Sequence, residues 1–469
     1  MVGLRPLEVA ALLAACAAAE VAVHAAGVGL SAGTLETSWH LLPAEVLRGR
    51  LLSGLWHLHA QPPLFNWLVG ASIQLAPAHE QAALHALLVG CGVCAVLSAA
   101  GLARTFGAGR AAPLAGLLLL AQPSFLLYEH HLGYEVPLAA ALGLSALWLA
   151  RAVEAGQGTW RSNALLFGSL SAAAAACLLR SLFALPFFLL AAGVAARAVG
   201  PRRTALAAAF PLLLLIGWQV KNEAVFGTWG ASSWLGMSLS RMSVERLTRP
   251  EKEALIARGR LSAASLVGGF QPLSAYPPAL AEVPPATADV PELRQPRKPG
   301  GAENFNHAGY LAVSAALAKD AEGAIRARPD VYAAAVGRAS LISLRPSSQW
   351  AFLADNERRL GWYAALWERL LCLELPLPIG LFGQTEVYLS LLFGLPWLAW
   401  VALRLALGPR GAPSSAAAIC ALAIATVFLV GNALEVGENN RFHAPLAPIF
   451  GALLVAGAAA KAGVQRRGP

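Results

Sequence analysis

Charged residues are scarce in this chain of 469 residues, of which only 13% are Asp, Glu, Lys or Arg. Soluble domains carry about 25% charged residues, so the composition excludes an ordinary soluble protein. Hydrophobic residues make up 57% of the chain and recur in long runs along most of its length. Together these features predict a polytopic membrane protein embedded in the lipid bilayer.

Several functional signatures are missing from the sequence. It has no Walker, Rossmann, zinc-protease or nucleophile-elbow motif, which argues against ATP-driven transport and against serine or metallo-hydrolase chemistry. Most of the six cysteines lie in hydrophobic runs, so no disulfide framework is predicted. Basic runs with interleaved aromatic residues are also missing, and the net charge of +9 therefore does not indicate a nucleic-acid partner.

The hydrophobic runs predict an all-α fold with about ten transmembrane helices. The expected spans are residues 7–30, 82–103, 111–127, 136–150, 163–179, 182–196, 204–220, 386–403, 415–433 and 442–460. A further apolar run, 62–75 (PPLFNWLVGASIQL), is short for a crossing and typical of a helix that lies on the membrane surface.

Arginines in the loops decide where 62–75 lies. If this run stays outside the bilayer and the N-terminus is cytoplasmic, most of the arginines in the short loops between spans are cytoplasmic, among them Arg104, Arg110, Arg202 and Arg203. Counting 62–75 as a span would turn these basic loops outward, against the positive-inside rule. We therefore expect an outer juxtamembrane helix at 62–75.

This topology divides the chain into three parts. They are an N-terminal transmembrane catalytic module (1–222, with outer loops 31–81 and 128–135), an extracytoplasmic region (223–385) and C-terminal transmembrane helices (386–469). Within the middle part, the proline-rich stretch 272–301 predicts an extended linker. The stretch 355–373 has one apolar face and predicts an interfacial helix.

Two carboxylates are expected at matching depth on the outer side. Glu36 follows the first span, and Glu135 opens the fourth. A carboxylate at the membrane boundary is costly unless it is paired, hydrated or used, and two together suit general-base chemistry or metal binding. The alternative is a solvated loop residue or, for Glu135, a favourable charge at a helix N-terminus.

Basic residues also stand at the outer ends of spans. Arg180, Lys221 and Arg441 could clamp a phosphate group, and the alternative is contact with lipid headgroups. The adjacent His130 and His131 could ligate a metal ion, although simple hydrogen bonding is the favoured interpretation.

Glu20 and His24 lie four residues apart inside the first span, on one helix face. An ionisable group within a span is a candidate functional group. A hydrogen bond between helices is the favoured interpretation here.

The order of these motifs resembles the GT-C superfamily of membrane glycosyltransferases, above all the branch with protein O-mannosyltransferases and the aminoarabinose transferase of lipid A. In that family a carboxylate after the first span precedes a juxtamembrane H/K-P-P-L-Y-x-W-L helix. Glu36 and residues 59–68 (HAQPPLFNWL) are similar, with Gln61 in place of the basic residue and His59 close by. Glu135 stands where the family has an acidic residue, usually Asp, that opens the fourth span.

Three basic residues extend the resemblance along the chain. Arg180 stands where the family has a Lys or Arg near the donor phosphate. Lys221, in KNEAVFG, resembles the family's R-N-x-x-x-F-G motif, and Arg441, in RFHAP, resembles its R-Y-x-x-P motif.

The resemblance implies a sugar transferase that uses a polyprenyl-phosphate-linked donor on the extracytoplasmic or lumenal side and inverts the anomeric centre. The acceptor would be a glycan, a lipid or a protein. Glu36 would act as general base, and Glu135 would position the acceptor, the base or a divalent metal ion, the one cofactor considered. His59, Gln61 and the basic residues Arg180, Lys221 and Arg441 would bind the donor and its phosphate.

Two rival functions remain open at this point. A transporter or flippase of a lipid-linked substrate would use the same basic groove without chemistry, but it predicts inverted repeats, which are not found in the sequence. A catalytically silent assembly protein would lack the paired acids. The Ala-, Gly- and Arg-rich composition favours a bacterial source and hence a plasma-membrane protein with its site facing outward.

Overall fold

The computed structural model describes residues 3–31, 33–156, 158–282, 289–381 and 384–465. Within these residues, eight helical stretches are long and apolar enough to cross a membrane. They are α1 (Pro6–Ala25), Pro77–Thr105 with α6 (Glu80–Thr105), α9 (Glu135–Glu154), α10 (Trp160–Leu179), α12 (Pro201–Phe226), α21 (Leu389–Ala406), Ala412–Leu434 with α22 (Ala412–Ala425) and α23 (Asn432–Leu434), and Asn439–Lys461 with the start of α24 (Ala447–Gln465).

Two further segments complete the ten predicted spans. The pair α7 (Pro113–Leu120) and α8 (Pro123–Glu129) passes the same test as one span but is bent by 65°. The bend follows from Pro123, because a proline drives the residue before it out of the helical region, and Gln122 is extended (φ −84°, ψ 119°). The tenth segment is the shorter apolar helix α11 (Leu185–Val199).

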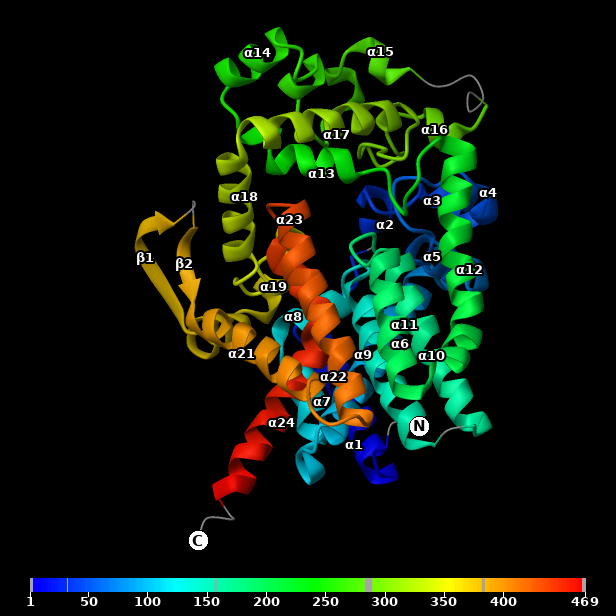
Figure 1. Cartoon of the computed structure of the whole chain (residues 1–469), viewed down its shortest axis with the longest axis vertical. Coiled ribbons are helices and arrows are strands. Elements are labelled where there is room, and N and C mark those ends of the chain that lie inside the picture. Colours follow the sequence, from blue (N-terminus) through cyan, green and yellow to red (C-terminus); the bar gives the residue numbers. More distant parts are fainter. Residues whose placement is uncertain (1–2, 32, 157, 283–288, 382–383, 466–469) are drawn as a thin grey trace.

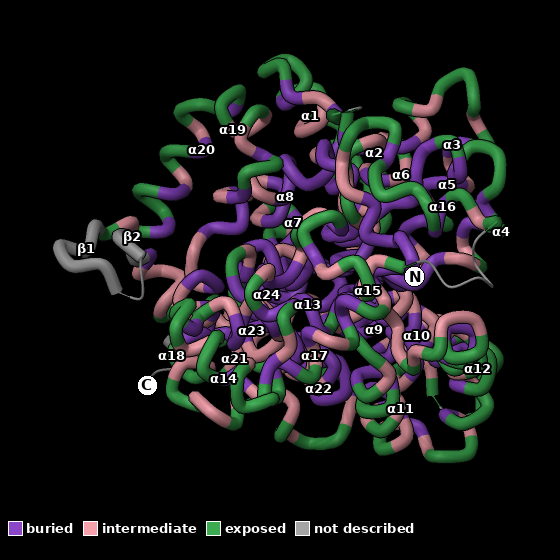
Figure 2. Tube along the Cα trace, turned by 90° about the horizontal axis from the view of Figure 1, so that it is seen from above, coloured by how far each residue is buried: buried purple, intermediate pink, exposed green. Residues whose placement is uncertain are grey.

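The transmembrane bundle is centred on α9. In the apolar 18-residue stretch of α9, 78% is buried inside the protein, whereas the corresponding share is 22% for α1 and 17% for α21. Figure 2 shows buried residues concentrated in the middle of the bundle and exposed residues at its edge. Small residues allow this close packing: a Cβ on Gly143 of α9 would lie 2.2 Å from Ser98 Oγ of α6. Glu135 is therefore the first residue of the most enclosed helix.

The stretch between the first two spans folds into four short helices. They are α2 (Thr34–Thr37), α3 (Ala44–Gly49), α4 (Leu51–Trp56) and α5 (Pro63–Leu75). α5 is the expected juxtamembrane helix, and it begins at Pro63 because the ring preorganises the first helical turn. Its buried Asn66 accepts from Leu42 N–H at 2.7 Å and donates to His40 C=O at 2.9 Å, which fixes the 38–43 loop.

An extramembrane layer covers one end of the bundle, opposite the end where α1 begins and α24 ends (Figure 1). It contains α13 (Leu235–Met242), α14 (Arg249–Ala257), α15 (Pro278–Ala281), α16 (Pro291–Arg294) and α17 (Gly309–Ala327). α13 and α17 pack closely, since a Cβ on Gly236 would lie 1.9 Å from Ser314 O. α18 (Pro329–Ile342) then leads from this layer to α23.

The interfacial helix expected over 355–373 is divided in the structure. α19 (Ala354–Leu360) stops at Gly361, which has a positive φ of 51°, and α20 (Trp362–Leu366) continues into a π-helical turn at Trp367–Leu371. An antiparallel hairpin of β1 (Glu374–Leu381) and β2 (Gln384–Tyr388) follows, with Glu374 opposite Tyr388. The sequence did not predict this hairpin, in which Pro376 excludes further helix.

Candidate active site

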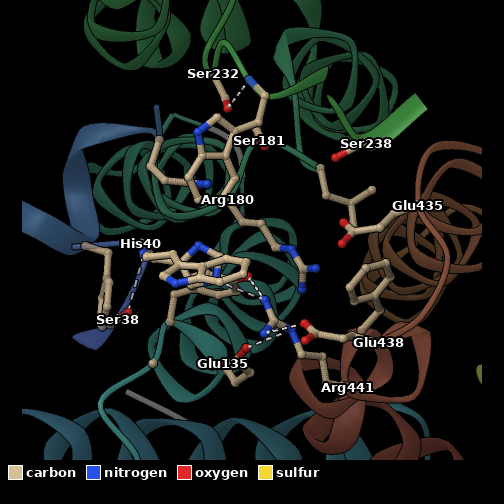
Figure 3. Close-up of a pocket in the computed structure, with 18 of the residues that line it drawn as sticks. Ser38, His40, Glu135, Arg180, Ser181, Ser232, Ser238, Glu435, Glu438 and Arg441 are labelled. Atoms are coloured by element: carbon tan, nitrogen blue, oxygen red, sulfur yellow. Dashed lines mark hydrogen bonds and ion pairs between the residues drawn. The ribbon is translucent and has the colours of Figure 1, made fainter. Parts of the chain in front are cut away.

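A cavity of about 420 Å³ lies between the bundle and the extramembrane layer. Its wall comes from α2 and the 38–40 loop, the start of α5, the 131–135 turn, the α10–α11 connection, α13, residues 350–352 and the segment before α24. Figure 3 shows side chains from these separate elements pointing into one space. Its charged, imidazole and amide side chains are His40, Gln61, His131, Glu135, Arg180, Arg241, Glu435, Glu438 and Arg441.

Arg441 and Glu135 form a buried ion pair at the base of this cavity. Their side chains are 5% and 3% exposed, and Arg441 Nε lies 3.6 Å from Glu135 Oε1. Arg441 Nη1 also meets Glu438 at 3.0 Å, and Nη2 donates to the Tyr134 hydroxyl. The guanidinium lies 4.5 Å from the Trp350 ring centroid. Arg441 thus joins the last span to the start of α9.

Arg180 is the second buried guanidinium, and its environment is different. α10 ends at Leu179, so Arg180 has extended backbone (φ −146°, ψ 128°) and its side chain enters the cavity. It lies 4.1 Å from the Phe442 ring centroid and 5.1 Å from that of Tyr134. Arg180 is 6% exposed, its Nη1 has no hydrogen-bond partner, and no carboxylate within the described ranges forms an ion pair with it.

The charges around the cavity show why Arg180 is distinctive. Arg441 is paired with two carboxylates, and Arg241 lies 3.7 Å from Glu435. A buried charge is costly unless it is paired. The unpaired N–H of Arg180 is thus a hydrogen-bond donor available to an anion in this part of the cavity, and a planar guanidinium suits phosphate.

Gln61 lines the cavity, whereas His59 does not. His59 is 1% exposed, and both ring nitrogens have protein partners: Nδ1 lies 2.8 Å from Ser233 Oγ and Nε2 lies 3.0 Å from Asn306 O. Burial lowers the pKa of His59 to about 3. Asn306 Oδ1 also accepts from His59 N–H at 2.9 Å. His59 therefore fastens the α4–α5 connection to the extramembrane layer.

Lys221 also holds the α4–α5 connection in place. Its Nζ donates to Leu58 O at 2.6 Å and lies 3.6 Å from the Trp218 ring centroid. It is buried and is not among the cavity-lining residues. The structure thus places Lys221 with His59 rather than with Arg180 and Arg441.

Glu36 is likewise outside the cavity lining. Thr34 and Thr37, three residues apart on α2, face the cavity, and Glu36 points elsewhere on this short helix. Its carboxylate lies 3.9 Å from Arg48 Nη1. Nearby, the buried Lys298 donates from Nζ to the carbonyls of Ser38 and Leu41, and burial lowers the pKa of Lys298 to about 7, against the opposing charge of Glu36.

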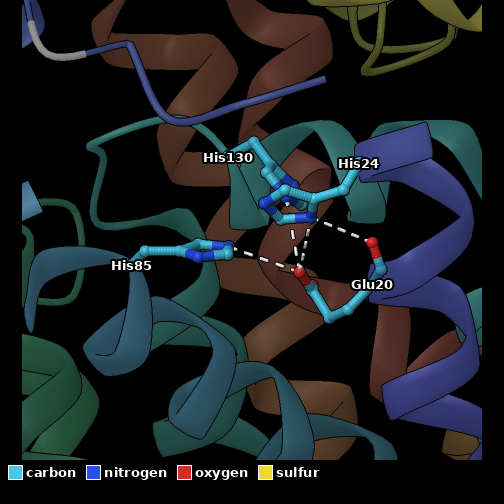
Figure 4. Close-up of side chains that lie close together, drawn as sticks. All are labelled: Glu20, His24, His85 and His130. Atoms are coloured by element: carbon cyan, nitrogen blue, oxygen red, sulfur yellow. Dashed lines mark hydrogen bonds and ion pairs between the residues drawn. The ribbon is translucent and has the colours of Figure 1, made fainter. Parts of the chain in front are cut away.

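The neighbouring histidines of the 128–135 turn separate. His131 faces the cavity, where its ring packs edge-on against Trp350 at 4.9 Å, and burial lowers its pKa to about 3. His130 points away, toward Glu20, and joins His24 and His85 in a cluster of metal-ligand type (Figure 4). Glu20 and His24 thus meet side chains of α6 and the turn after α8.

Sequence reasoning missed several cavity residues as site candidates. His40 lies 3.4 Å from Arg441 Nη2, and burial together with Arg441 and Arg180 holds its pKa well below the usual range. Glu435, Glu438 and Arg241 add three charges. The acidic pair was visible in the EVGENNR segment before the last span, but Arg241 gave no local signal, because its partner Glu435 is remote in sequence.

Comparison with known proteins gives matches among solved structures. No family model and no curated protein matches the chain. The chain is similar to ArnT from Cupriavidus metallidurans bound to undecaprenyl phosphate (15% identity, covering 98% of this chain and 79% of that one, TM-score 0.35) and in the apo state (16%, 96% and 79%, 0.36). It is also similar to the archaeal oligosaccharyltransferase AglB from Archaeoglobus fulgidus in complex with an inhibitory peptide and a dolichol-phosphate (13%, 87% and 43%, 0.37).

The TM-scores are low, and the functional proposal below therefore rests on the residues of this chain. Its described residues form a polytopic, mainly helical membrane fold with a cavity, lined by apolar and charged side chains, beneath an extramembrane layer.

Proposed function

We propose that this chain is a membrane glycosyltransferase that moves a sugar from a polyprenyl-phosphate carrier to an acceptor on the extracytoplasmic side. The observation that carries the proposal is Arg180, a buried cation with an unpaired N–H in a cavity that also holds a buried carboxylate, Glu135. A phosphate at Arg180 would supply the missing anion. The carboxylate would supply a base for a hydroxyl nucleophile.

The proposed reaction is a single displacement with inversion. The acceptor hydroxyl oxygen attacks the anomeric carbon, and its proton passes to the Glu135 carboxylate. The bond between the anomeric carbon and the phosphate oxygen breaks, and its electron pair leaves with the polyprenyl phosphate. Arg180 stabilises the charge that develops on this leaving group, as preorganised donors do in other transferases. Arg441 holds Glu135 and Tyr134 in position.

The base assignment moves from Glu36 to Glu135 in this proposal. Glu135 lines the cavity, whereas Glu36 lies beside Arg48. Gln61 is placed to contact the substrate, whereas His59 and Lys221 support the wall behind it. The lipid-linked donor and the outward orientation are predictions that rest on the motifs and the loop arginines.

Sugar transfer in proteoliposomes tests the proposal. The donor would be a lipid extract from a deletion strain, in which the polyprenyl-phosphate sugar accumulates, and mass spectrometry would follow both the free carrier phosphate and the glycosylated acceptor. Glu135→Gln should lower the rate by about 10²–10⁴-fold, the usual range for losing a general base. The matched control is Glu253→Gln on the surface of α14.

Two outcomes would reject the proposal. One is sugar transfer by Glu135→Gln at the control rate. The other is movement of the intact donor across the bilayer with no cleavage of the sugar–phosphate bond, which is the behaviour of a flippase.

A further inference from the structure

Four side chains of metal-ligand type converge at a place outside the cavity (Figure 4). Glu20 and His24 come from α1, His85 from α6 and His130 from the turn after α8. One ligand atom of each lies within 4.8 Å of the corresponding atoms of the other three. Three separate segments of the chain thus direct their polar atoms to a single point.

The distances from the Glu20 carboxylate to the three histidines are those of neighbouring ligands around one metal ion. Glu20 Oε2 lies 3.3 Å from His85 Nε2, 3.4 Å from His130 Nε2 and 3.6 Å from His24 Nδ1. These distances exceed the usual N–H···O range of about 2.7–3.2 Å. In a tetrahedral zinc site with bonds of about 2.0–2.1 Å, neighbouring ligand atoms are about 3.4 Å apart.

The converging atoms are also buried and make no regular hydrogen bond. Glu20 Oε2, His85 Nε2 and His130 Nε2 are all enclosed and have no hydrogen-bond partner in the described part of the chain. Placing polar atoms in this way is costly unless something binds them. A metal ion at the point of convergence would accept all three lone pairs.

A supporting contact sets the orientation of His130. Its Nδ1 lies 2.8 Å from the Leu126 carbonyl and donates to it, which leaves the Nε2 lone pair directed at the cluster. Metal-bound histidines are commonly oriented by such a carbonyl contact. His24 is the peripheral member, because its Nδ1 also lies 2.9 Å from the Glu20 carbonyl and its side chain is half exposed.

We propose that Glu20, His85 and His130 bind a divalent transition-metal ion, with Zn²⁺ preferred, and that His24 closes the fourth position. Two or three imidazoles with one carboxylate suit zinc and its neighbours, whereas Mg²⁺ and Ca²⁺ require shells made mainly of oxygen. The proposal does not depend on the proposed sugar transfer.

The site would act as a clamp on the cavity wall. It ties α1 and α6 to the turn that carries His131 and leads into Glu135, both of which line the cavity. The metal would thereby fix the start of α9 without contacting the substrate.

Metal binding by the full-length chain tests this inference. The protein is purified in detergent, stripped with a chelator and titrated with Zn²⁺ against a competing indicator, and its metal content is measured by mass spectrometry. We expect the wild type to bind one Zn²⁺ per chain. His85→Ala should bind Zn²⁺ at least about tenfold more weakly, because even the loss of a group that only supports a metal ligand weakens binding by about that factor. The matched control is His79→Ala, an exposed histidine shortly before His85.

A second readout separates binding from misfolding. Zn²⁺ should raise the thermal midpoint of the wild type and of His79→Ala, but much less that of His85→Ala; His24→Ala should show the mildest loss. If His85→Ala fails to fold, Co²⁺ is added to the stripped wild type instead. A four-coordinate site should then give strong visible absorption. Failure of the stripped wild type to take up Zn²⁺ or Co²⁺ would leave a metal-free ion-pair cluster and overturn the proposal. Equal affinities for the two alanine variants would overturn it as well.

Discussion

Replacing Arg180 by methionine should move stability and activity in opposite directions. An uncompensated buried charge costs about 3–5 kcal/mol. The contacts of Arg180 with the Phe442 and Tyr134 rings return about 0.5–2 kcal/mol each. Arg180→Met removes both effects and fills a similar volume, so the substrate-free protein should gain about 1–2 kcal/mol of folding free energy and unfold at a higher temperature.

Activity should fall in the same variant. Losing one preorganised donor to developing negative charge costs about 10²–10³-fold in kcat, or about 2.7–4 kcal/mol. The assay is the rate of sugar transfer in proteoliposomes, with inhibition by free polyprenyl phosphate as a measure of phosphate binding. Arg180→Lys should recover part of the rate, since it retains the charge but not the planar donor pair.

The control for Arg180→Met is Arg249→Met. Arg249 is 81% exposed on α14 and paired with Glu253, so its replacement should change stability and rate very little. A lower thermal midpoint for Arg180→Met would contradict an uncompensated charge at this position. The wild-type rate together with wild-type inhibition by polyprenyl phosphate would contradict phosphate binding by Arg180.

Three further predictions address other parts of the molecule. In the transfer assay, Glu135→Gln should lose much more activity than Glu36→Gln, because Glu135 lines the cavity and Glu36 does not; the reverse order would return the base role to Glu36. Gly236→Ala should lower stability by about 1–3 kcal/mol in thermal unfolding, because its Cβ would meet the α17 backbone, whereas Gly217→Ala in open space on α12 should be neutral or stabilising; equal midpoints would contradict the close contact. Because His59 has a folded pKa of about 3, below its ordinary value, the unfolded chain gains the proton first as the pH falls, and stability is lost below about pH 6.5 at up to ~1.4 kcal/mol per pH unit. His59→Gln should therefore show a shallower fall in thermal midpoint between pH 6.5 and 5, and identical slopes for the variant and the wild type would exclude His59 as the cause. Some fall should persist in the variant, because the pKa values of the buried His131 and His40 are lowered as well.

The membrane spans were predictable because the bilayer imposes length and hydropathy on each one. All ten expected runs contain an apolar helix or helix pair in the structure, and α5 is too short to cross. Residues at the cavity-side ends of spans were predictable as a group for the same reason. Glu135, Arg180 and Arg441 begin or end spans on one side, and the structure gathers them around one cavity.

The direction of side chains within the loops on the cavity side was not predictable from the sequence. Glu36 sits on a helix of only four residues, where one step along the chain decides between the cavity and the Arg48 side. His59 and Lys221 contact residues that are far away in the chain. No local sequence pattern predicts Asn306 as the partner of His59. The cluster of Glu20 with His85 and His130 likewise depends on how three segments pack.

The pairing of Glu135 with Arg441 has a consequence for synthesis of the chain. Arg441 is made about 300 residues after Glu135, and at about 5–20 residues per second the carboxylate waits about 15–60 s for its partner. During that interval Glu135 opens a span with no guanidinium beside it, which is costly within a bilayer. Insertion of α9 should then remain reversible until the last span arrives, so a chain truncated before Asn439 should be a substrate for membrane quality-control proteases.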